Sequence, residues 1–425
     1  MFGAERPNVV VIVADDLGYS DVGVQGNKDV PTPHIDSIAG NGLRFTSGYV
    51  SCPVCSPTRA GLMTGRYQQR FGHEFNPGPL APQNFGLPLT EKTIGDRMKA
   101  LGYTTGWIGK SHLGNREDYL PQKRGFDQFF GFLGGAHDYF AVGAGNNALV
   151  RGDKSLEKSD GYLTETLASE ACAFIESNKT KPFLLYLPFN AVHMPAQAPE
   201  KYYGRVREGL APSRRTYCAM IAALDDGVGA VLGKLRETKL EENTLVFFIS
   251  DNGGSNARDT STNGALRAKK GSVYDGGVRV VWMMQWKGHV PAGVTDDRPV
   301  IALDIYPTAV AAAGGEIKPD WKLDGVNLLP FVTGGNKAAP HEALYWRFGA
   351  QGAIRQGGWK LVKPSATEDW QLYHLARDIG EQTNLVAQES DRAKSLQTLW
   401  EKWNGELAKP MWQGRGGAAK QKKKK

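Results

Sequence analysis

The sequence predicts an α/β protein with a mostly parallel central sheet flanked by helices, followed by a small C-terminal antiparallel sheet with a helix. Three observations predict this class. Apolar, β-branched runs alternate with longer segments of helical periodicity, the apolar runs end in polar residues, and short strand-like runs separated by turns come late in the chain. Strands that alternate with helices form parallel sheets covered on both faces.

Four strands are expected in the first part of the chain, at residues 8–14, 104–108, 183–188 and 244–250. Helices are expected before the last three, at residues 90–101, 162–178 and 214–238. Polar side chains follow each strand: Asp15 and Asp16, then Lys110 and His112, then Asn190 and His193, then Asp251 and Asn252. Because α/β sheets bind ligands at the carboxyl ends of their strands, these residues are expected to meet at one site.

The chain changes character near residue 330. Residues 324–339 are rich in Gly, Pro and short polar residues, and short strands are then expected at 343–348, 353–355 and 359–363, with a helix at 391–407. We therefore expect a catalytic α/β domain over residues 1–330, an α+β subdomain over 331–412 and a disordered basic tail over 413–425.

Composition excludes several classes of protein. The chain has 425 residues, of which 41% are hydrophobic and 22% charged, as in soluble proteins. It contains no apolar run of the ~20 residues that a membrane span needs. Five of its seven net positive charges come from Lys420 and 422–425, so the rest of the chain carries +2. The rest of the sequence has no basic stripe interleaved with aromatic residues, so nucleic-acid binding is not expected.

The four cysteines are Cys52, Cys55, Cys172 and Cys218. The spacing of the first two is that of a redox or zinc pair, but no second pair or matching histidines follow, so a zinc site is rejected. The other two lie in helical patterns and are expected to be buried.

The strongest functional signal is residues 55–66, which read Cys-Ser-Pro-Thr-Arg-Ala-Gly-Leu-Met-Thr-Gly-Arg. They resemble the signature of the type I sulfatases, Cys-x-Pro-x-Arg followed by Thr-Gly-Arg. The resemblance implies an alkaline-phosphatase-like fold and the conversion of Cys55 to Cα-formylglycine by a formylglycine-generating maturation enzyme. It implies that the aldehyde hydrate attacks sulfur, and that Arg59 holds the hydrate and nearby oxygens.

The oxygen donors at the strand ends suit a hard divalent cation. Asp15, Asp16, Asp251 and Asn252 favour Ca²⁺, with Mg²⁺ as the alternative and zinc disfavoured. The sulfatase pattern places these four residues and the modified Cys55 around the metal.

Residues 102–113 resemble the second sulfatase signature, a Gly-Tyr run that ends in Gly-Lys-x-His. The resemblance implies that Lys110 binds a sulfate oxygen and that His112 takes a proton from the hydrate as sulfate leaves. The family often has Trp where this chain has Ser111, which affects the expected pocket wall.

Two further matches complete the catalytic set. His193 matches the family histidine that contacts the sulfate ester and protonates the leaving oxygen. Lys270 matches the lysine of a Lys-Gly-x-x-x-Glu-Gly-Gly-x-Arg segment, with Lys269 as the competing candidate. In this segment Asp275 replaces the usual Glu, and Val281 stands where Pro is common. Residues 372–385 resemble the segment that ends many sulfatases.

The expected substrate is a sulfated carbohydrate. Residues 67–74 and 134–137 look like segments of bacterial sulfatases that act on sulfated galactans such as carrageenan. Arg70, His73, Glu74, His137 and Asp138 are therefore candidates for sugar contacts, although each is equally consistent with a structural role. Such a substrate favours a periplasmic or secreted enzyme. No signal peptide is visible, and the sequence indicates no oligomeric state.

Three alternatives stay open. One is a sulfatase of glycosaminoglycans or other sugars. The second is a phosphatase or phosphodiesterase of the same superfamily, which would use Ser or Thr and two metals. Asn252 stands where a two-zinc enzyme typically has His, so one metal is expected. The third is a glycan-binding protein that lost catalysis, which predicts gaps in the residue set, and we find none.

Overall fold

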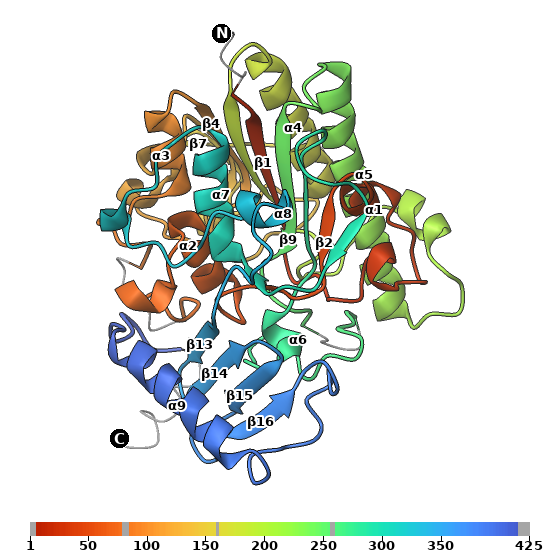
Figure 1. Cartoon of the computed structure of the whole chain (residues 1–425). Helices are drawn as coiled ribbons and strands as arrows, with labels where there is room; N and C mark the ends of the chain where they lie inside the picture. Colours follow the sequence, from red (N-terminus) through yellow and green to blue (C-terminus); the bar gives the residue numbers. More distant parts are fainter. Residues whose placement is uncertain (1–5, 79–84, 159–160, 256–259, 415–425) are drawn as a thin grey trace, which may run out of the picture.

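The computed structural model describes residues 6–78, 85–158, 161–255 and 260–414 (Figure 1). The basic tail expected from residue 413 lies outside this part from residue 415 onwards. None of the described helices combines the length and apolar character needed to cross a membrane.

A ten-stranded sheet forms the centre, in the order β11-β2-β10-β9-β1-β8-β4-β5-β6-β7. Strands β9, β1, β8, β4 and β5 run parallel to one another, whereas β10 pairs antiparallel with β9, β6 with β5, and β7 with β6. The bounds are β1 Asn8–Ala14, β2 Leu43–Phe45, β4 Thr104–Lys110, β5 Gln128–Phe132, β6 Val150–Arg151, β7 Lys154–Ser155, β8 Phe183–Pro188, β9 Thr244–Ser250, β10 Trp282–Gln285 and β11 Val294–Asp296. β3 Gly48–Tyr49 and β12 Val300–Ile301 form a separate pair.

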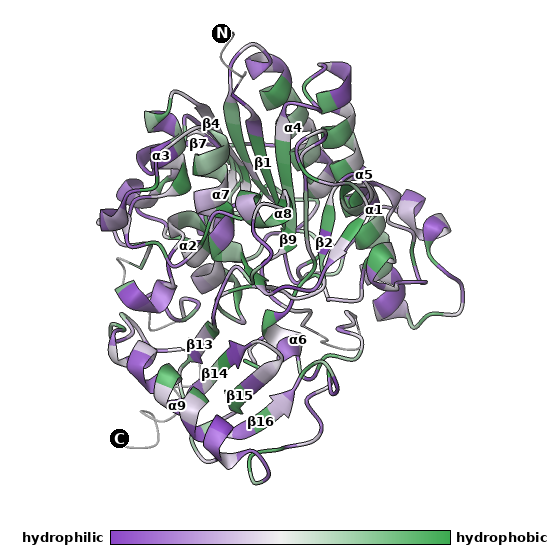
Figure 2. Cartoon of the chain, viewed as in Figure 1, coloured by the Kyte–Doolittle hydropathy of each residue, from purple (hydrophilic) through white to green (hydrophobic). Residues whose placement is uncertain are grey.

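Helices cover both faces of this sheet. Alternate side chains of β1 enter two separate apolar clusters, with Val9 and Val11 on one side and Val10 and Ile12 on the other. This alternation explains why β1 is apolar along its whole length, and the central strands stand out as hydrophobic in Figure 2. The helices are α1 Pro33–Gly40, α2 Cys55–Thr64, α3 Ile94–Ala100, α4 Leu163–Asn178, α5 Pro212–Glu237, α6 Asp275–Val278, α7 Ile305–Ala312 and α8 Leu329–Val332.

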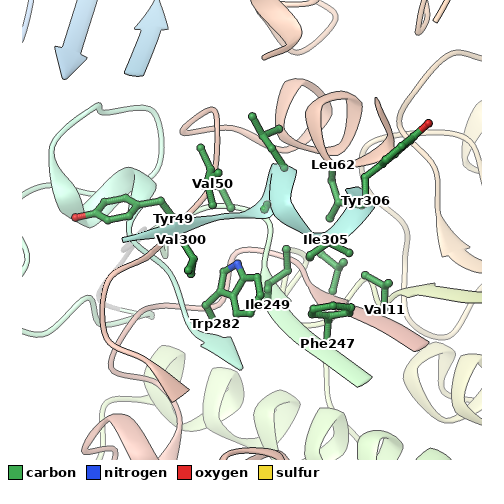
Figure 3. Close-up of a cluster of buried hydrophobic side chains, with 14 of the residues drawn as sticks. Val11, Tyr49, Val50, Leu62, Phe247, Ile249, Trp282, Val300, Ile305 and Tyr306 are labelled. Carbon is green, nitrogen blue, oxygen red and sulfur yellow. The ribbon is translucent and has the colours of Figure 1, made fainter. Parts of the chain in front are cut away.

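One of the two clusters supports α2, the helix that begins with Cys55. Leu62 of α2 and Ile305 of α7 pack with Val11 and Phe247 of the sheet (Figure 3). Every residue of α2 is buried. The helix is thus fixed against the sheet by its apolar side, which fixes the position of its first turn.

The C-terminal part is a four-stranded antiparallel sheet covered by one helix. It contains β13 Leu344–Phe348, β14 Gln351–Gln356, β15 Trp359–Lys363 and β16 Gln371–His374 in that order, and α9 Ser390–Gly405 packs on it. In Figure 1 this sheet lies below the carboxyl end of β1. Trp346 joins the two parts, because its indole N–H donates to Val50 O at 2.7 Å.

The predicted fold class is confirmed. Three predicted strands match β1, β8 and β9 residue for residue, and the expected C-terminal sheet and helix are present. The helix expected at 90–101 begins later, at Ile94, because Thr93 and Asp96 form a capping box at its N-terminus.

Candidate active site

The carboxyl ends of β1, β4, β8 and β9 bring the expected polar residues together. Asp15 and Asp16 follow β1, Asp251 and Asn252 follow β9, and all four are buried. The backbone N–H of Asp16 donates to Asp251 Oδ1 at 3.2 Å, and Asn252 Nδ2 donates to Asp16 Oδ1 at 2.7 Å. The ends of β1 and β9 are therefore joined directly by their polar residues.

Cys55 lies at the first turn of α2, facing these carboxylates. Its Sγ is 3.7 Å from Asp15 Oδ1, 3.9 Å from Asp16 Oδ1 and 3.1 Å from Lys270 Nζ. Burial raises the pKa of the Cys55 thiol to about 12. Since only a thiolate is a good nucleophile, this cysteine is unreactive as a plain thiol at neutral pH.

Arg59, one turn further along α2, holds the two strand ends together. Its Nε and Nη2 donate to Asp251 Oδ2 at 3.0 and 2.7 Å, and its Nη1 donates to Lys110 O at 3.3 Å. Its side chain is fully buried. Such a forked interaction fixes both the carboxylate and the guanidinium in one orientation.

Two lysines neutralise the adjacent aspartates. Lys110 Nζ lies 2.6 Å from Asp15 Oδ2, and Lys270 Nζ lies 2.6 Å from Asp16 Oδ1. Burial acts to raise the pKa of Asp15, but the charges of Lys110 and its neighbours outweigh it and hold that pKa below its usual value. Lys269, the competing lysine, is exposed. Both aspartates are thus kept ionised.

The buried oxygens fit a hard cation. Asp15, Asp16, Cys55 and His193 each offer one ligand atom, and these atoms all lie within 4.8 Å of one another. Asn252 Oδ1 is buried and has no hydrogen-bond partner among the described residues. A buried carbonyl oxygen without a donor is costly unless something binds it. Carboxylate and amide oxygens dominate this set, which suits Ca²⁺ or Mg²⁺.

Two histidines line an open pocket of about 510 Å³ above Cys55. His112 is buried, and its Nδ1 has no hydrogen-bond partner in the described part of the chain. Burial, with the charge of Lys110 added, lowers its pKa well below the usual value, so the imidazole is neutral. His193 Nε2 lies 3.7 Å from Asp16 Oδ2 on the wall of the same pocket.

Two of the three departures from the family pattern, Ser111 and Asp275, carry polar side chains and differ in their contacts. Ser111 Oγ is buried without a hydrogen-bond partner among the described residues. Asp275 accepts hydrogen bonds from Lys360 Nζ at 2.6 Å and Tyr49 Oη at 3.0 Å, and it pairs with Arg279. Both oxygens of the Asp275 carboxylate therefore have partners within the fold.

Three of the five candidate sugar contacts are bound internally. Arg70 pairs with Asp324, and Glu74 pairs with Arg347. His73 is fully buried, and its Nε2 lies 2.7 Å from Ser56 Oγ. These three side chains do not line the pocket above Cys55.

The other two candidates lie beside the pocket. His137 is buried, with its ring nitrogens near the carbonyls of Asp138 and Val142. The Asp138 carboxylate accepts from the backbone N–H groups of Phe140 and Ala141, and from Gln197. The pocket is lined on this side by Gly135 and Ala136 instead.

Several residues that the sequence did not single out line the pocket. They are Val54, Phe75, Asn76, Pro77, Asn147 and Phe348. The ring centroids of Phe75 and Phe348 lie 5.3 Å apart, although the two residues are far apart in the sequence. Nothing local in the sequence marks them, because their proximity depends on how the C-terminal sheet packs.

Comparisons with known proteins find sulfatases along almost the whole chain. The family model described as Sulfatase matches residues 7–315, and that described as N-sulphoglucosamine sulphohydrolase, C-terminal, matches residues 268–408. Arylsulfatase A of Homo sapiens is 33% identical over 438 residues, covering 90% of this chain and 84% of that protein. N-acetylgalactosamine-6-sulfatase of Sus scrofa is 31% identical over 397 residues, covering 88% and 75%. The chain spans 66% of arylsulfatase J of Mus musculus.

A solved structure gives a further match. The crystal structure of Ps i-CgsB in complex with k-i-k-neocarrahexaose is 37% identical to this chain, with a TM-score of 0.90. The match covers 96% of this chain and 95% of that chain.

Proposed function

The chain belongs to the sulfatase family, and on that premise we propose that it removes sulfate from a sulfated galactan of the carrageenan type, using a formylglycine made from Cys55. One observation carries this proposal. Cys55 lies at the floor of an open pocket, next to the carboxylates of Asp15 and Asp16 and the ammonium group of Lys270. Hydrolysis of sulfate esters is the reaction of the family.

A divalent cation is part of the proposal. Asp15, Asp16, Asp251 and Asn252 would hold Ca²⁺, or Mg²⁺ as the second choice, next to residue 55. When bound, such a cation offsets the negative charge of the sulfate group and of the attacking oxygen.

Formylglycine explains why a buried cysteine occupies this position. The Cys55 thiol is held neutral by burial, so it needs a chemical change to become useful. As a hydrate, formylglycine supplies one hydroxyl that attacks sulfur and a second whose deprotonation expels sulfate. The partner required is therefore a formylglycine-generating maturation enzyme.

The two lysines bind the sulfate group. Nζ of Lys110 is held by Asp15, and Nζ of Lys270 is held by Asp16. Their ammonium groups donate to sulfate oxygens and compensate the charge that builds up during attack. Arg59 positions this cluster through Asp251 and touches no pocket surface.

The two histidines move the protons. His193 lies on the pocket wall and donates a proton to the leaving sugar oxygen. His112 is neutral, and its ring lines the pocket beside Cys55, so it accepts the proton of the second hydroxyl. His193 thus acts when the sugar oxygen leaves, and His112 acts when sulfate is expelled from the hydrate.

The substrate class rests on a comparison. The structure with k-i-k-neocarrahexaose covers nearly this whole chain at 37% identity. The pocket above Cys55 is open and has Phe75 and Phe348 on its wall, and aromatic rings suit the apolar face of a sugar. A polymer of this kind is met outside the cytoplasm, so we place the enzyme in the periplasm or outside the cell.

A glycosaminoglycan is the second candidate. The C-terminal family match is named for a glucosamine sulphohydrolase, and one relative is an N-acetylgalactosamine-6-sulfatase. A phosphatase role is less favoured, because Asn252 takes the position expected for a second-metal histidine.

Sulfate release tests the proposal. The chain is co-expressed with a formylglycine-generating enzyme and incubated with carrageenan oligosaccharides, glycosaminoglycan oligosaccharides, a small aryl sulfate and an aryl phosphate. Ion chromatography then measures free sulfate and phosphate. We expect sulfate release from carrageenan oligosaccharides. Release from glycosaminoglycans alone would support the second candidate, and phosphate release alone would contradict the proposal.

A further inference from the structure

A second pocket lies on the joint between the central fold and the C-terminal sheet. It has a volume of about 580 Å³ and is lined by three arginines, Arg279, Arg298 and Arg355. It shares no lining residue with the pocket above Cys55. Within its lining, Asp297 is the one carboxylate, and that residue is exposed.

Arg355 is a buried cation that makes no direct ion pair with a carboxylate among the described residues, and the hydroxyl of Tyr49 connects it to Asp275. It is 7% exposed, and it comes from β14. Its Nε donates to Gly357 O at 3.1 Å, and its Nη1 donates to Tyr49 Oη at 2.6 Å. No Asp or Glu oxygen of the described residues forms an ion pair with it, and no hydrogen bond there uses its Nη2. Asp275 is already paired directly with Lys360 and Arg279, so the buried charge of Arg355 is stabilised further by an added counter-ion or by solvent.

Arg279 adds a second set of donors to the same pocket. It is 6% exposed, with Nε donating to Thr46 O at 2.7 Å and Nη1 donating to Asp275 Oδ2 at 3.2 Å. Its Nη2 is likewise without a hydrogen bond among the described residues. The third guanidinium, of Arg298, is held by Asp296. The pocket lining thus contains two guanidinium groups that are held in place by hydrogen bonds. In each of them Nη2 donates no hydrogen bond to a described residue.

The remaining lining supplies a neutral donor. Ser47 is 3% exposed and lines the pocket, and its hydroxyl makes no hydrogen bond within the described part of the chain. Two positively charged guanidinium groups, each with one unbonded terminal nitrogen and with a hydroxyl beside them, match the oxygens of a compact oxyanion better than they match a neutral ligand.

We propose that this pocket is an oxyanion site that binds sulfate, either as the free ion or as a sulfate group on a polysaccharide. The proposal rests on Arg279, Arg355 and Ser47, none of which belongs to the catalytic set. It therefore stands or falls independently of the chemistry at Cys55.

Ala376 allows a test that leaves the buried arginines in place. This residue lines the pocket and is exposed, in a turn after β16. Ala376→Glu places a carboxylate at the pocket, Ala376→Lys places an ammonium there, and Ala376→Gln is the neutral control of matched size. A charge about 4 Å from the anion should change its affinity by roughly fivefold even at the dielectric constant of bulk water, and by more at that of a protein surface.

Equilibrium dialysis with radiolabelled sulfate at fixed ionic strength measures the affinity. We expect two classes of site in the wild type, of which one weakens in Ala376→Glu, strengthens in Ala376→Lys and stays unchanged in Ala376→Gln. Arg355→Gln should remove that class while activity on a small aryl sulfate is kept. Equal binding in all Ala376 variants would overturn the proposal.

Kinetics separate the two sources of sulfate. If the pocket holds a sulfate group of the polymer, the KM for a polysulfated oligosaccharide rises in Ala376→Glu and falls in Ala376→Lys, while the KM for the aryl sulfate is constant. If it holds the free ion, the dialysis constants move and both KM values stay constant. Either pattern supports an oxyanion site.

Discussion

His112 is the residue whose surroundings most directly indicate a proton transfer. It lines the catalytic pocket, it is neutral, and its buried Nδ1 has no partner among the described residues. We predict that His112→Ala lowers kcat on a small aryl sulfate by about a hundredfold or more, as for other general acid–base groups. His289→Ala, a change at an exposed histidine, is the control. A variant that keeps a tenth of the wild-type kcat would argue against this role.

His73 shows a different effect, on stability. Burial lowers its pKa to about 3, and its ring packs against both Phe85 and Trp412. In the unfolded chain it gains a proton as the pH falls through roughly 6.5. Protons therefore favour the unfolded state over this range, and the folded state loses stability as the pH falls from about 6.5 towards 3.

The prediction compares His73→Gln with wild type. Urea unfolding at several pH values should show a shallower loss of stability in the variant below pH ~6.5, by up to roughly 4 kcal/mol at the acid end. His289→Ala should keep the wild-type slope. Equal slopes in wild type and His73→Gln would show that His73 does not resist protonation.

These two histidines show what can be predicted for single residues. The motif around Lys110 identified His112 as a site residue. His73 follows the Cys55 motif and resembles a sugar contact in sequence, but its partners Ser56, Phe85 and Trp412 cover it. Burial by distant segments leaves no trace in the local pattern.

Helix α2 connects the core to the reacting residue. A Cβ added at Gly61 would lie 2.6 Å from Ser51 Oγ, 2.9 Å from Gln68 Oε1 and 3.0 Å from Leu303 Cδ2. The first two atoms form a hydrogen bond of 2.7 Å with each other. A Cβ at position 61 would therefore have to displace Ser51 or Gln68 from their shared hydrogen bond, or shift α2 itself.

We predict that Gly61→Ala is destabilising although alanine is the better helix former. Alanine gains about 1 kcal/mol in helix propensity, whereas overpacking costs about 1–3 kcal/mol and displaces α2. Thermal unfolding should show a lower Tm together with a reduced kcat. Gly40→Ala, with open space around the added Cβ, is the control and should be neutral or stabilising. A higher Tm in Gly61→Ala would contradict this account.

Most elements around the site could be predicted because their apolar periodicity is long. β1, β8 and β9 are fully buried strands whose ends are marked by the polar residues that follow them. The strands β2, β10 and β11 were not predicted. They have three or four residues each, and their pairing depends on segments far apart in the chain. Strands this short carry too little pattern to be recognised locally.

At the scale of the whole molecule, a buried charge cluster joins α6 to the C-terminal sheet. Lys360 Nζ lies 2.6 Å from Asp275 Oδ1 and 3.1 Å from Glu381 Oε1, with all three side chains at 0% exposure. Burial acts to lower the pKa of Lys360, but the charges of Asp275 and Glu381 outweigh it and raise that pKa. The lysine therefore stays charged and compensates two carboxylates.

We predict that Lys360→Met destabilises the fold by about 3–5 kcal/mol, because it leaves Glu381 buried without its cation and Asp275 with Arg279 alone. Urea unfolding measures the difference. Lys363→Met, at the end of the same strand, is the control and should have little effect. If the two variants are equally stable, the cluster does not hold α6 against the sheet.

The central claim is that Cys55 is the precursor of the reacting group. Intact mass of its peptide after co-expression with a maturation enzyme, measured with the sulfatase activity of the same sample, tests it most directly. We predict a loss of about 18 Da at Cys55 for conversion of thiol to aldehyde, with activity in proportion to the converted fraction. Cys55→Ala should be inactive, and Cys52→Ala should keep its activity. Full activity in a sample whose Cys55 is an unmodified thiol would contradict the account.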